Sequence, residues 1–376
     1  MKSYDVAVIG GGIIGGSIAL ELARHNLRVV VLDRQAPGRE ASWAAAGMLA
    51  PVAETRESAA FMELAKASFA LYPEFIAAVE SESGQSAEFR RYGTLHLFFS
   101  TESELERDRM LAELRACGIP VETISIADAR RHEPALNRDA RAAIWLRDEA
   151  AVDPRLLTES IFAAGTKRGA EIRSGAAVTS LIREGARVRG VIAGGSKISA
   201  GSVIVAAGCF SGGIEGLDRY APTSPVRGQM IALRGENIPH QCILRSHRGY
   251  TVPRGDGRVL AGSTLENAGF EKLVTPGGMQ QILGAALELA PSAANAAIVE
   301  TWAGLRPDTP DHLPLLGPTD VEGLLIATGH YRNGILLAPI TAKVIREWIV
   351  NGSTAVPVAE FSPLRFVGDK RGVAVS

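Results

Sequence analysis

Cysteine is scarce in this sequence, and no cysteine stands in a metal-binding spacing. The 376 residues include three cysteines, Cys117, Cys209 and Cys242, which lie far apart along the chain. An odd number of cysteines without a C-x-x-C pair argues against a disulfide framework and against a zinc site. We therefore expect reduced thiols in a cytoplasmic protein that binds no metal.

An excess of one charge and long apolar runs are also lacking. Lysine plus arginine number 40 and aspartate plus glutamate 41, so the formal net charge is −1. Nucleic-acid-binding proteins usually carry a basic face, so this balance predicts no nucleic-acid partner. No segment reaches about 18 uninterrupted apolar residues, the length of a bilayer crossing, and we expect no membrane span.

The sequence does contain enough apolar residues for a large core. Hydrophobic residues make up 46% and charged residues 22%, which is ordinary for a globular protein. A chain of 376 residues exceeds the usual size of one domain. We therefore expect two domains.

A glycine-rich turn between a strand and a helix stands near the start of the chain. Residues 4–9 (YDVAVI) are apolar and β-branched, which is typical of a buried parallel strand. The segment after the turn repeats apolar residues every four positions, which predicts a helix. The glycines of the turn follow the spacing G-x-G-x-x-G and are Gly10, Gly12 and Gly15.

A second strand, RVVVLD, ends at Asp33, eighteen residues after Gly15. Asn26 can end the intervening helix in a left-handed conformation. In dinucleotide-binding folds the glycines allow a tight turn and a close approach of the pyrophosphate, and the acidic residue binds ribose hydroxyls. Strand, turn, helix and acid occur together here, so we predict a dinucleotide site. The motif alone does not separate NAD from FAD.

Two further segments carry runs of very small side chains. They are residues 41–49 (ASWAAAGML) and the end of residues 201–213 (GSVIVAAGCFSGG). Small side chains let a large ligand approach the backbone, although a tightly packed helix start would give the first run the same composition. An extended ligand that touches several strand ends suits FAD buried lengthwise.

Several motifs together resemble a known family. They are the glycine-rich start, ASWAAAGML (41–49), VIVAAG (203–208), WAGLRPDTPDHLPLLG (302–317) and GHYRNGILLAP (329–339). Essentially from end to end, the chain resembles the FAD-dependent D-amino-acid oxidase superfamily, and most strongly the glycine oxidases of bacterial thiamine biosynthesis. The resemblance implies an α/β fold (α+β overall), with a Rossmann-like FAD-binding domain of the glutathione-reductase type and an inserted antiparallel-sheet substrate domain.

The resemblance also implies where the two domains lie along the chain. A discontinuous FAD-binding domain is expected to comprise residues 1–86, 146–222 and 303–376. The substrate-binding domain is expected to comprise residues 87–145 and 223–302. Relatives of this kind often self-associate, so the resemblance leaves a homo-oligomer open.

Family members oxidise small amino acids or amines, such as glycine, sarcosine or D-amino acids. A hydride passes from the α carbon to flavin N5, an imine forms, and oxygen accepts the electrons to give hydrogen peroxide. A dehydrogenase that passes electrons to a quinone or carrier is an alternative within the superfamily. A flavin-binding subunit of a larger enzyme stays open as well, whereas the charge balance disfavours a tRNA-modifying flavoprotein module.

Three residues match the family's substrate site. The planar fork of an arginine suits a carboxylate, and Arg306 matches the family arginine with that role; a structural ion pair with Asp308 or Asp311 is the alternative. Tyr250 matches a tyrosine that hydrogen-bonds the substrate, although an aromatic residue in a strand is also typical of a core. Arg332 matches a second active-site arginine, where a solvated loop charge is the alternative. His330, beside it, is assigned no acid–base role.

The resemblance implies non-covalent FAD, because no cysteine lies in the motifs through which some relatives attach flavin. The expected cofactor-binding residues occupy the glycine-rich turn, the small-residue runs and the turn near residue 330. They are Gly10, Gly12, Ile13, Ile14, Gly15, Asp33, Arg34, Ala41, Ser42, Ala46, Gly47, Met48, Val178, Ala207, Gly208, His330, Tyr331, Asn333, Gly334, Ile335 and Leu336.

Two positions depart from the glycine oxidase pattern, which has a histidine at Arg248 and a methionine at Leu265. Since these positions border the family's substrate pocket, we hypothesise that Arg248 admits a polar or acidic substrate side chain. A separate expectation concerns Pro339, which is best tolerated in a first helical turn. The last helix is therefore expected to begin between Gly334 and Leu337, after an irregular turn at residues 329–336.

Overall fold

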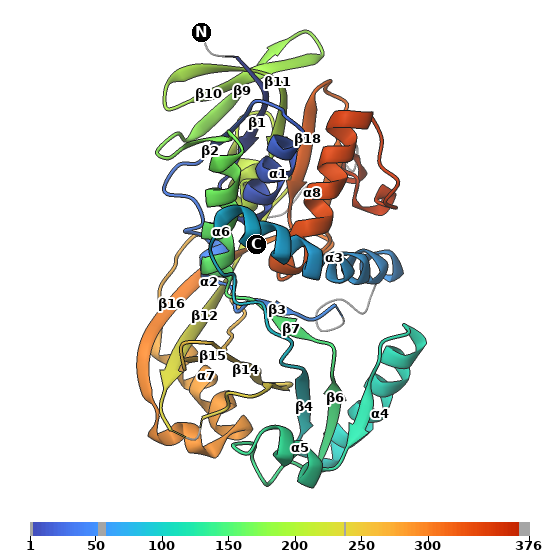
Figure 1. The fold of residues 1–376 in the computed structure, drawn as a ribbon, viewed down its shortest axis with the longest axis vertical. Coiled ribbons are helices and arrows are strands. Elements are labelled where there is room, and N and C mark those ends of the chain that lie inside the picture. The colour runs from blue at the N-terminus through green and yellow to red at the C-terminus, as the bar shows by residue number, and fades with distance from the viewer. Residues whose placement is uncertain (1–2, 52–57, 237, 368–376) are drawn as a thin grey trace.

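The computed structural model describes residues 3–51, 58–236 and 238–367. The chain forms two halves with one eight-stranded sheet in each (Figure 1). The expected domain ranges also include residues 1–2, 52–57, 237 and 368–376, which lie outside the described residues. The domain limits themselves stay a prediction.

The first sheet has a parallel centre, as the expected dinucleotide fold requires. Its main strand order is β17-β18-β11-β1-β2-β8, with β9 and β10 attached to β11 as an antiparallel extension. β1, β2, β8, β11 and β18 run parallel, and β17 is antiparallel to β18. The bounds are β1 Ser3–Ile9, β2 Val29–Leu32, β8 Glu171–Arg173, β9 Val178–Glu184, β10 Arg187–Ala193, β11 Ser196–Val205, β17 Leu315–Pro318 and β18 Leu324–Thr328.

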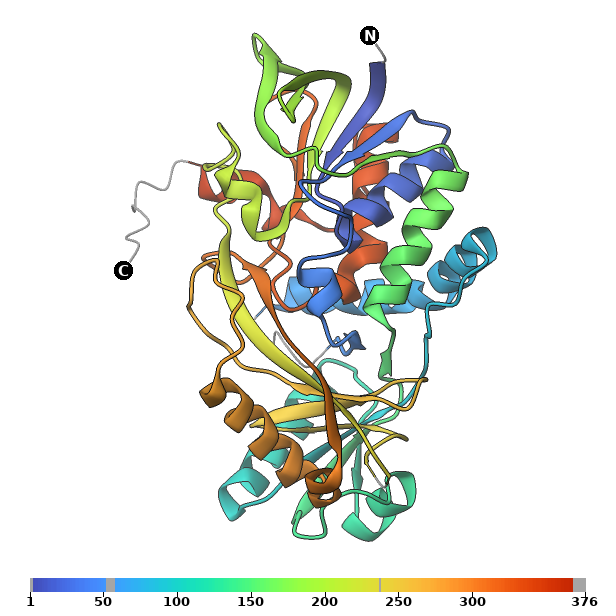
Figure 2. The ribbon, with the colours of Figure 1, turned by 90° about the vertical axis from the view of Figure 1, so that its left-hand side faces the viewer.

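Four helices pack together beside this sheet. They are α1 Ile13–Arg24, α3 Ala59–Ser83, α6 Pro154–Lys167 and α8 Gly334–Asn351. Figure 2 shows α1, α6 and α8 side by side on one face of the sheet. The predicted strand–turn–helix–strand start of the chain is confirmed, and Asn26 follows α1 with a φ of 61°, the left-handed conformation predicted for it.

The second sheet is antiparallel except at one pair. Its order is β16-β12-β15-β14-β13-β4-β6-β5, and β13 pairs with β4 in parallel, so the predicted antiparallel sheet is mixed at that point. The bounds are β4 Thr94–Phe98, β5 Glu122–Ile124, β6 Ala142–Leu146, β12 Ser224–Arg234, β13 Ile243–Ser246, β14 Gly249–Pro253, β15 Val259–Gly262 and β16 Ala297–Asp308. Helices α4 Thr101–Ala116, α5 Ile126–His132 and α7 Pro276–Leu289 lie in this half (Figure 1).

Short elements lie where the two halves meet. They are helix α2 Ala41–Ala44, strands β3 Met48–Leu49 and β7 Ala150–Ala151, and the 3-10 helix η1 Gly208–Gly213. The long strands β12 and β16 run from this junction into the lower half (Figure 1). All of β16 pairs with β12 in the second sheet, and its upper end reaches η1 of the first half, where Pro307 lies near Gly208.

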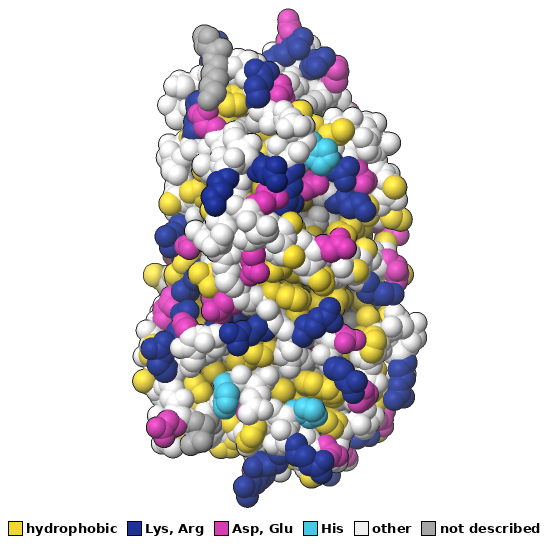
Figure 3. Space-filling model, in the orientation of Figure 1, with side chains coloured by type: hydrophobic (Ala, Val, Ile, Leu, Met, Phe, Trp, Pro, Cys, Tyr) yellow, Lys and Arg dark blue, Asp and Glu magenta, His cyan; other side chains and the backbone are white. Residues whose placement is uncertain are grey.

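On the surface, acidic and basic side chains are interspersed over the face seen in Figure 3. Among the described residues, no helix is both long enough and apolar enough to cross a membrane.

The last helix contains a proline in its interior. α8 begins at Gly334, within the predicted range, so the irregular turn comprises residues 329–333 and not 329–336. Pro339 has no N–H to offer the carbonyl of Ile335, four residues earlier. The Tyr72 hydroxyl of α3 donates to that carbonyl, and Ser68 Oγ donates to the next one, of Leu336, at 2.6 Å. Tyr72 thus replaces the donor whose absence led us to expect Pro339 in the first turn, while Ser68 bridges the Leu336 carbonyl and the Ile340 N–H.

We expect Tyr72→Phe to lower the free energy of unfolding by about 1–3 kcal/mol, because it leaves the buried Ile335 carbonyl without its donor. In a Pro339→Ala background the loss should be smaller, since an alanine at this position restores a backbone N–H for the same carbonyl. Denaturant unfolding of the four proteins in this cycle measures the coupling. Equal losses in both backgrounds would contradict the assignment of the Tyr72 bond.

Candidate active site

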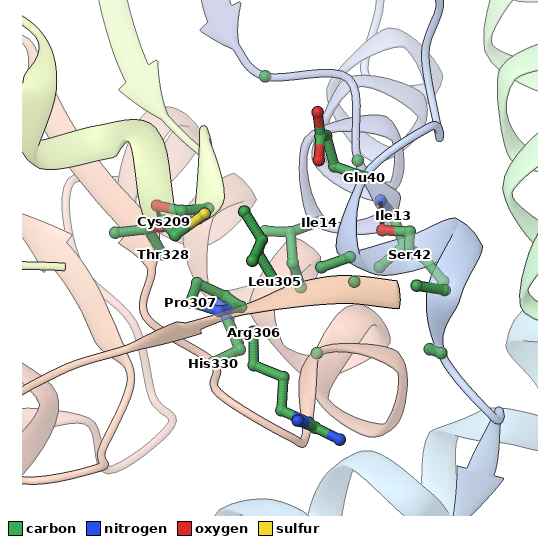
Figure 4. A pocket seen from close by; sticks show the side chains of 18 of the residues that line it. Ile13, Ile14, Glu40, Ser42, Cys209, Leu305, Arg306, Pro307, Thr328 and His330 are labelled. Carbon is green, nitrogen blue, oxygen red and sulfur yellow. Dashed lines mark hydrogen bonds between the residues drawn. The ribbon is translucent and has the colours of Figure 1, made fainter. Parts of the chain in front are cut away.

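A long cavity lies at the junction of the two sheets. Its walls come from the β1–α1 turn, the segment around α2, η1, the upper ends of β12 and β16, and the turn before α8. Figure 4 shows Ile14 and Leu305 between Glu40 at one end of the view and Arg306 at the other. The residues expected to bind cofactor or substrate all line this cavity, except Gly15 and Leu336.

Gly10 and Gly15 shape the turn that opens the cavity. Gly10 has a φ of 104°, and a Cβ there would lie 2.4 Å from the Ala206 carbonyl oxygen. A Cβ on Gly15 would lie 1.9 Å from the Gly10 carbonyl oxygen, which explains why Gly15 packs behind the turn and does not line the cavity. At the start of α1, the Ile13 N–H donates to Ser42 Oγ at 2.9 Å. Helix N-termini of this kind favour phosphate groups.

Asp33 is fixed at the end of β2 by backbone donors. Its two carboxylate oxygens accept from the Gly11 N–H at 2.6 Å and from the Gln35 N–H at 2.9 Å. Burial raises the pKa of the Asp33 carboxyl, against the opposing effect of these bonds. A dinucleotide requires an acceptor for its ribose hydroxyls and a helix N-terminus for its pyrophosphate. Asp33 and the start of α1 provide these two groups. These residues therefore fit an FAD.

The small-residue run around α2 presents its backbone to the cavity and is held from behind. A Cβ on Gly47 would lie 2.1 Å from the Val152 carbonyl oxygen, and its φ is 76°. The Ala44 carbonyl accepts from Trp302 Nε1 at 3.0 Å, and the Ala46 carbonyl accepts from the buried guanidinium of Arg254. Side-chain donors from the second sheet thus set the position of this backbone segment.

Arg306 occupies the end of β16 and lies across the neighbouring strand. Its Nη2 donates to Ser263 Oγ at 2.8 Å and its Nη1 to the Thr264 carbonyl at 3.2 Å. A Cβ on Gly228 of β12 would lie 2.3 Å from both terminal nitrogens. The glycine therefore makes the space in which the guanidinium lies.

The two aspartates considered as ion-pair partners of Arg306 have partners of their own. Asp308 accepts a hydrogen bond from His312 Nδ1 at 2.8 Å. The Asp311 carboxylate accepts from Arg365 Nε at 2.8 Å and from Arg365 Nη2 at 2.9 Å. The choice between a substrate-binding and a structural role for Arg306 stays a prediction.

Tyr250 belongs both to the cavity wall and to the core. Its side chain is 8% exposed and packs within a hydrophobic cluster, while its hydroxyl donates to Met230 Sδ at 3.4 Å. Because both residues also line the cavity, the core interpretation and the substrate-site interpretation of Tyr250 are compatible.

The turn at residues 329–333 is tied to the end of β16. The Tyr331 N–H donates to the Pro307 carbonyl at 2.8 Å, and Tyr331 takes a φ of 47°. Arg332 is exposed and lines the cavity. This hydrogen bond brings the turn that carries Arg332 next to the strand that carries Arg306.

His330 lies in the same turn but is fully enclosed. One ring nitrogen, Nε2, lies 3.0 Å from Thr341 Oγ1. Burial lowers the pKa of the His330 imidazole from its ordinary value of 6.5 to about 3. The ring is therefore neutral at physiological pH.

The two positions that depart from the family pattern lie outside the cavity lining. Arg248 pairs with Glu288 of α7 at 2.8 Å, and Leu265 is 59% exposed. The tight β13–β14 turn directs Arg248 toward α7, where it is neutralised. These contacts do not favour the hypothesis that Arg248 admits a polar or acidic substrate side chain, which stays a prediction.

Sequence reasoning missed several cavity-lining residues. Glycines inside strands β12 and β16 were available signals, because glycine in a strand often marks a close approach. Glu40 adjoins the run at 41–49 and Phe210 lies within the run at 201–213, but neither has a motif of its own, and Phe270 comes from a distant segment. The missed residues that matter below are Glu40, Phe210, Gly228, Met230, Phe270 and Gly304.

Comparison with known proteins identifies the family to which this fold and cavity correspond. A family model described as FAD dependent oxidoreductase (DAO) matches residues 5–348. The glycine oxidase of Pseudomonas putida is 33% identical over 365 residues, which cover 96% of this chain and 98% of that protein. The crystal structure of glycine oxidase from Geobacillus kaustophilus superposes with a TM-score of 0.93 at 30% identity, covering 98% of this chain and 100% of the other.

A longer relative is also similar. The bifunctional protein ThiO/ThiG of Synechocystis sp. is 36% identical over 370 residues, covering 96% of this chain and 54% of that protein. The chain thus spans about half the length of this relative.

The neutral, buried His330 predicts a pH dependence of stability. Between pH 6.5 and about 3 the unfolded chain binds a proton at this residue that the folded chain does not. The free energy of unfolding should therefore fall as pH is lowered through this window, by up to about 1.4 kcal/mol per pH unit from this residue. Denaturant unfolding of the wild type and of His330→Gln at several pH values, at constant FAD concentration, measures it. The two stability curves should converge at acid pH, and parallel curves would contradict the assignment.

Proposed function

We propose that this chain, which belongs to the DAO family of FAD-dependent oxidoreductases, oxidises the α carbon of a small amino acid or amine such as glycine, sarcosine or a D-amino acid. The products are an imine and, with oxygen as acceptor, hydrogen peroxide. The observation that carries the proposal is the oriented guanidinium of Arg306 in a cavity that Tyr250 and the dinucleotide turn also line.

The chain's own residues provide binding and orientation. Bound FAD supplies the two-electron acceptor. The planar fork of Arg306 binds the substrate carboxylate, and Ser263 Oγ together with the Thr264 carbonyl fixes the plane of that fork. Tyr250 contributes a hydroxyl at the cavity wall. Holding the carboxylate at Arg306 would orient the α carbon within the cavity, and positioning of this kind lowers the barrier substantially.

The start of α8 adds an electrostatic contribution. Asn333, Gly334 and Ile335 line the cavity where the helix begins. The first N–H groups of a helix have no intrahelical acceptor and carry a partial positive charge. They favour negative charge in the cavity, which suits both a substrate carboxylate and a reduced cofactor.

The full-length match to a protein named glycine oxidase supports the choice of substrate class. A role in thiamine biosynthesis, implied by the resemblance to the glycine oxidases of that pathway, belongs to the same proposal. An electron acceptor other than oxygen, a quinone or a carrier protein, is the alternative that the following experiment decides.

The test is a substrate panel on the purified chain with FAD. We expect glycine, sarcosine or a D-amino acid to bleach the flavin absorbance without oxygen and to yield about one peroxide per turnover in air. Bleaching without peroxide would identify a dehydrogenase. Failure of every amino acid and amine in the panel to reduce the flavin would contradict the proposal.

Arg306→Lys should lower kcat/KM roughly 100-fold, because a lysine keeps the charge but loses the two-pronged contact, a change of about 2–3 kcal/mol.

Arg332→Ala should raise KM while FAD stays bound, because this arginine forms an outer wall of the site. Steady-state kinetics and the flavin content of each variant provide the measurement. Loss of FAD or of folding in Arg332→Ala would assign that residue a structural role instead.

A further inference from the structure

We propose that residues 266–275, in the segment after β15 of the second sheet, form the outer wall of the adenosine half of the FAD site. Within this segment Phe270 and Lys272 are the residues that retain the cofactor. Phe270 lines the cavity although it lies far along the chain from the dinucleotide motif. Its side chain is 56% exposed, so core packing does not account for an aromatic residue at this place.

Phe270 belongs to a group of three side chains at the end of β2. Its ring stacks on that of Phe210 in η1, with centroids 5.1 Å apart and planes 29° from parallel. The Arg34 guanidinium lies over the same Phe210 ring, 3.6 Å from its centroid. Arg34 directly follows Asp33, the expected ribose ligand. The stack therefore stands where the adenosine half of a dinucleotide is expected.

Lys272 ties the segment to the same end of the cavity through an ion pair. Its Nζ lies 3.0 Å from Glu40 Oε2, and Glu40 also pairs with Arg34 and accepts from Gln35 Nε2 at 2.7 Å. Glu40 itself lines the cavity, at the end opposite Arg306 in Figure 4. The ion pair thus links a loop of the second sheet to the nucleotide end of the first.

Hydrogen bonds to β12 fix both ends of the segment, and this limits where the residues between them can lie. Arg227 and Glu266 exchange backbone hydrogen bonds at 2.9 and 3.0 Å and form a side-chain ion pair. The Gln229 side chain donates to Glu266 Oε1 at 2.7 Å and accepts from the Thr275 N–H at 2.8 Å. Anchored to β12 on both sides, the segment brings Phe270 and Lys272 against the first half of the molecule.

The ordinary arrangement places the nucleotide entirely on the Rossmann-like half. Here Asp33 and Val178 of that half line the expected adenosine end, and Phe270 of the other half lines the same cavity. Lys272 reaches this end through its ion pair with Glu40. An aromatic ring and a cation at the rim suit a planar base and a diphosphate. Both contacts would slow the escape of FAD.

The test is a titration of apoprotein with FAD, followed by the quenching of flavin fluorescence. Phe270→Ala should raise the Kd roughly tenfold, as expected for the loss of an aromatic stacking contact together with buried area. Lys272→Met should raise it roughly threefold, the size of effect expected for a partly exposed ion pair. Only the Lys272 effect should shrink in high salt, because salt screens charge and not stacking.

Three controls separate cofactor retention from folding. Leu273→Ala changes an equally exposed residue of the same segment and should leave the Kd unchanged. Phe270→Tyr and Lys272→Arg keep the ring and the charge and should keep near-wild-type Kd values. The thermal midpoints of the apoproteins should all agree. Wild-type Kd values in Phe270→Ala and Lys272→Met would overturn the proposal, as would a weaker Kd that accompanies a lower apoprotein midpoint and is not rescued by the conservative variants.

Discussion

The antiparallel pairing of β12 with β16 is the constraint on which the site depends. Its register sets Gly228 opposite Gly304 and Val226 opposite Arg306. Two facing glycines leave a stretch of bare backbone in the cavity wall, and the Arg306 guanidinium lies over one of them. Since side chains alternate between the faces of a strand, a slip of one residue would turn Arg306 away from the cavity and fill the bare stretch. Correct chemistry here requires correct register.

How much the sequence predicts depends on how local each signal is. The dinucleotide turn is read from a short stretch in which each glycine has its own steric reason, and the structure has the predicted strand, helix and left-handed Asn26. The start of α8 at Gly334 also lies within the range predicted from the sequence. The position of Pro339 inside that helix could not be predicted, because the donor that replaces the missing backbone N–H is Tyr72 on another helix.

The same limit applies to the site. Arg306 is marked by its motif, but Ser263, which orients it, has no signature in the sequence and meets it only through the fold. Arg248 shows the converse case. Its position in the sequence suggested a place at the substrate pocket, yet its guanidinium forms an ion pair with Glu288 on α7. The environment of a charged residue is therefore poorly predicted where an element from a distant segment supplies its partner.

The β12–β16 ladder also has a consequence for the order in which the protein forms. The dinucleotide turn is synthesised within the first sixteen residues, whereas β16 and the turn before α8 lie between residues 297 and 334. Contacts of such large sequence separation form late, because closing a long loop is slow. During synthesis the part of α1 that packs on α8 therefore stays uncovered until α8 leaves the ribosome. The nascent chain depends on its last quarter both for its core and for its cofactor pocket. It is therefore most exposed to aggregation before that quarter has been synthesised.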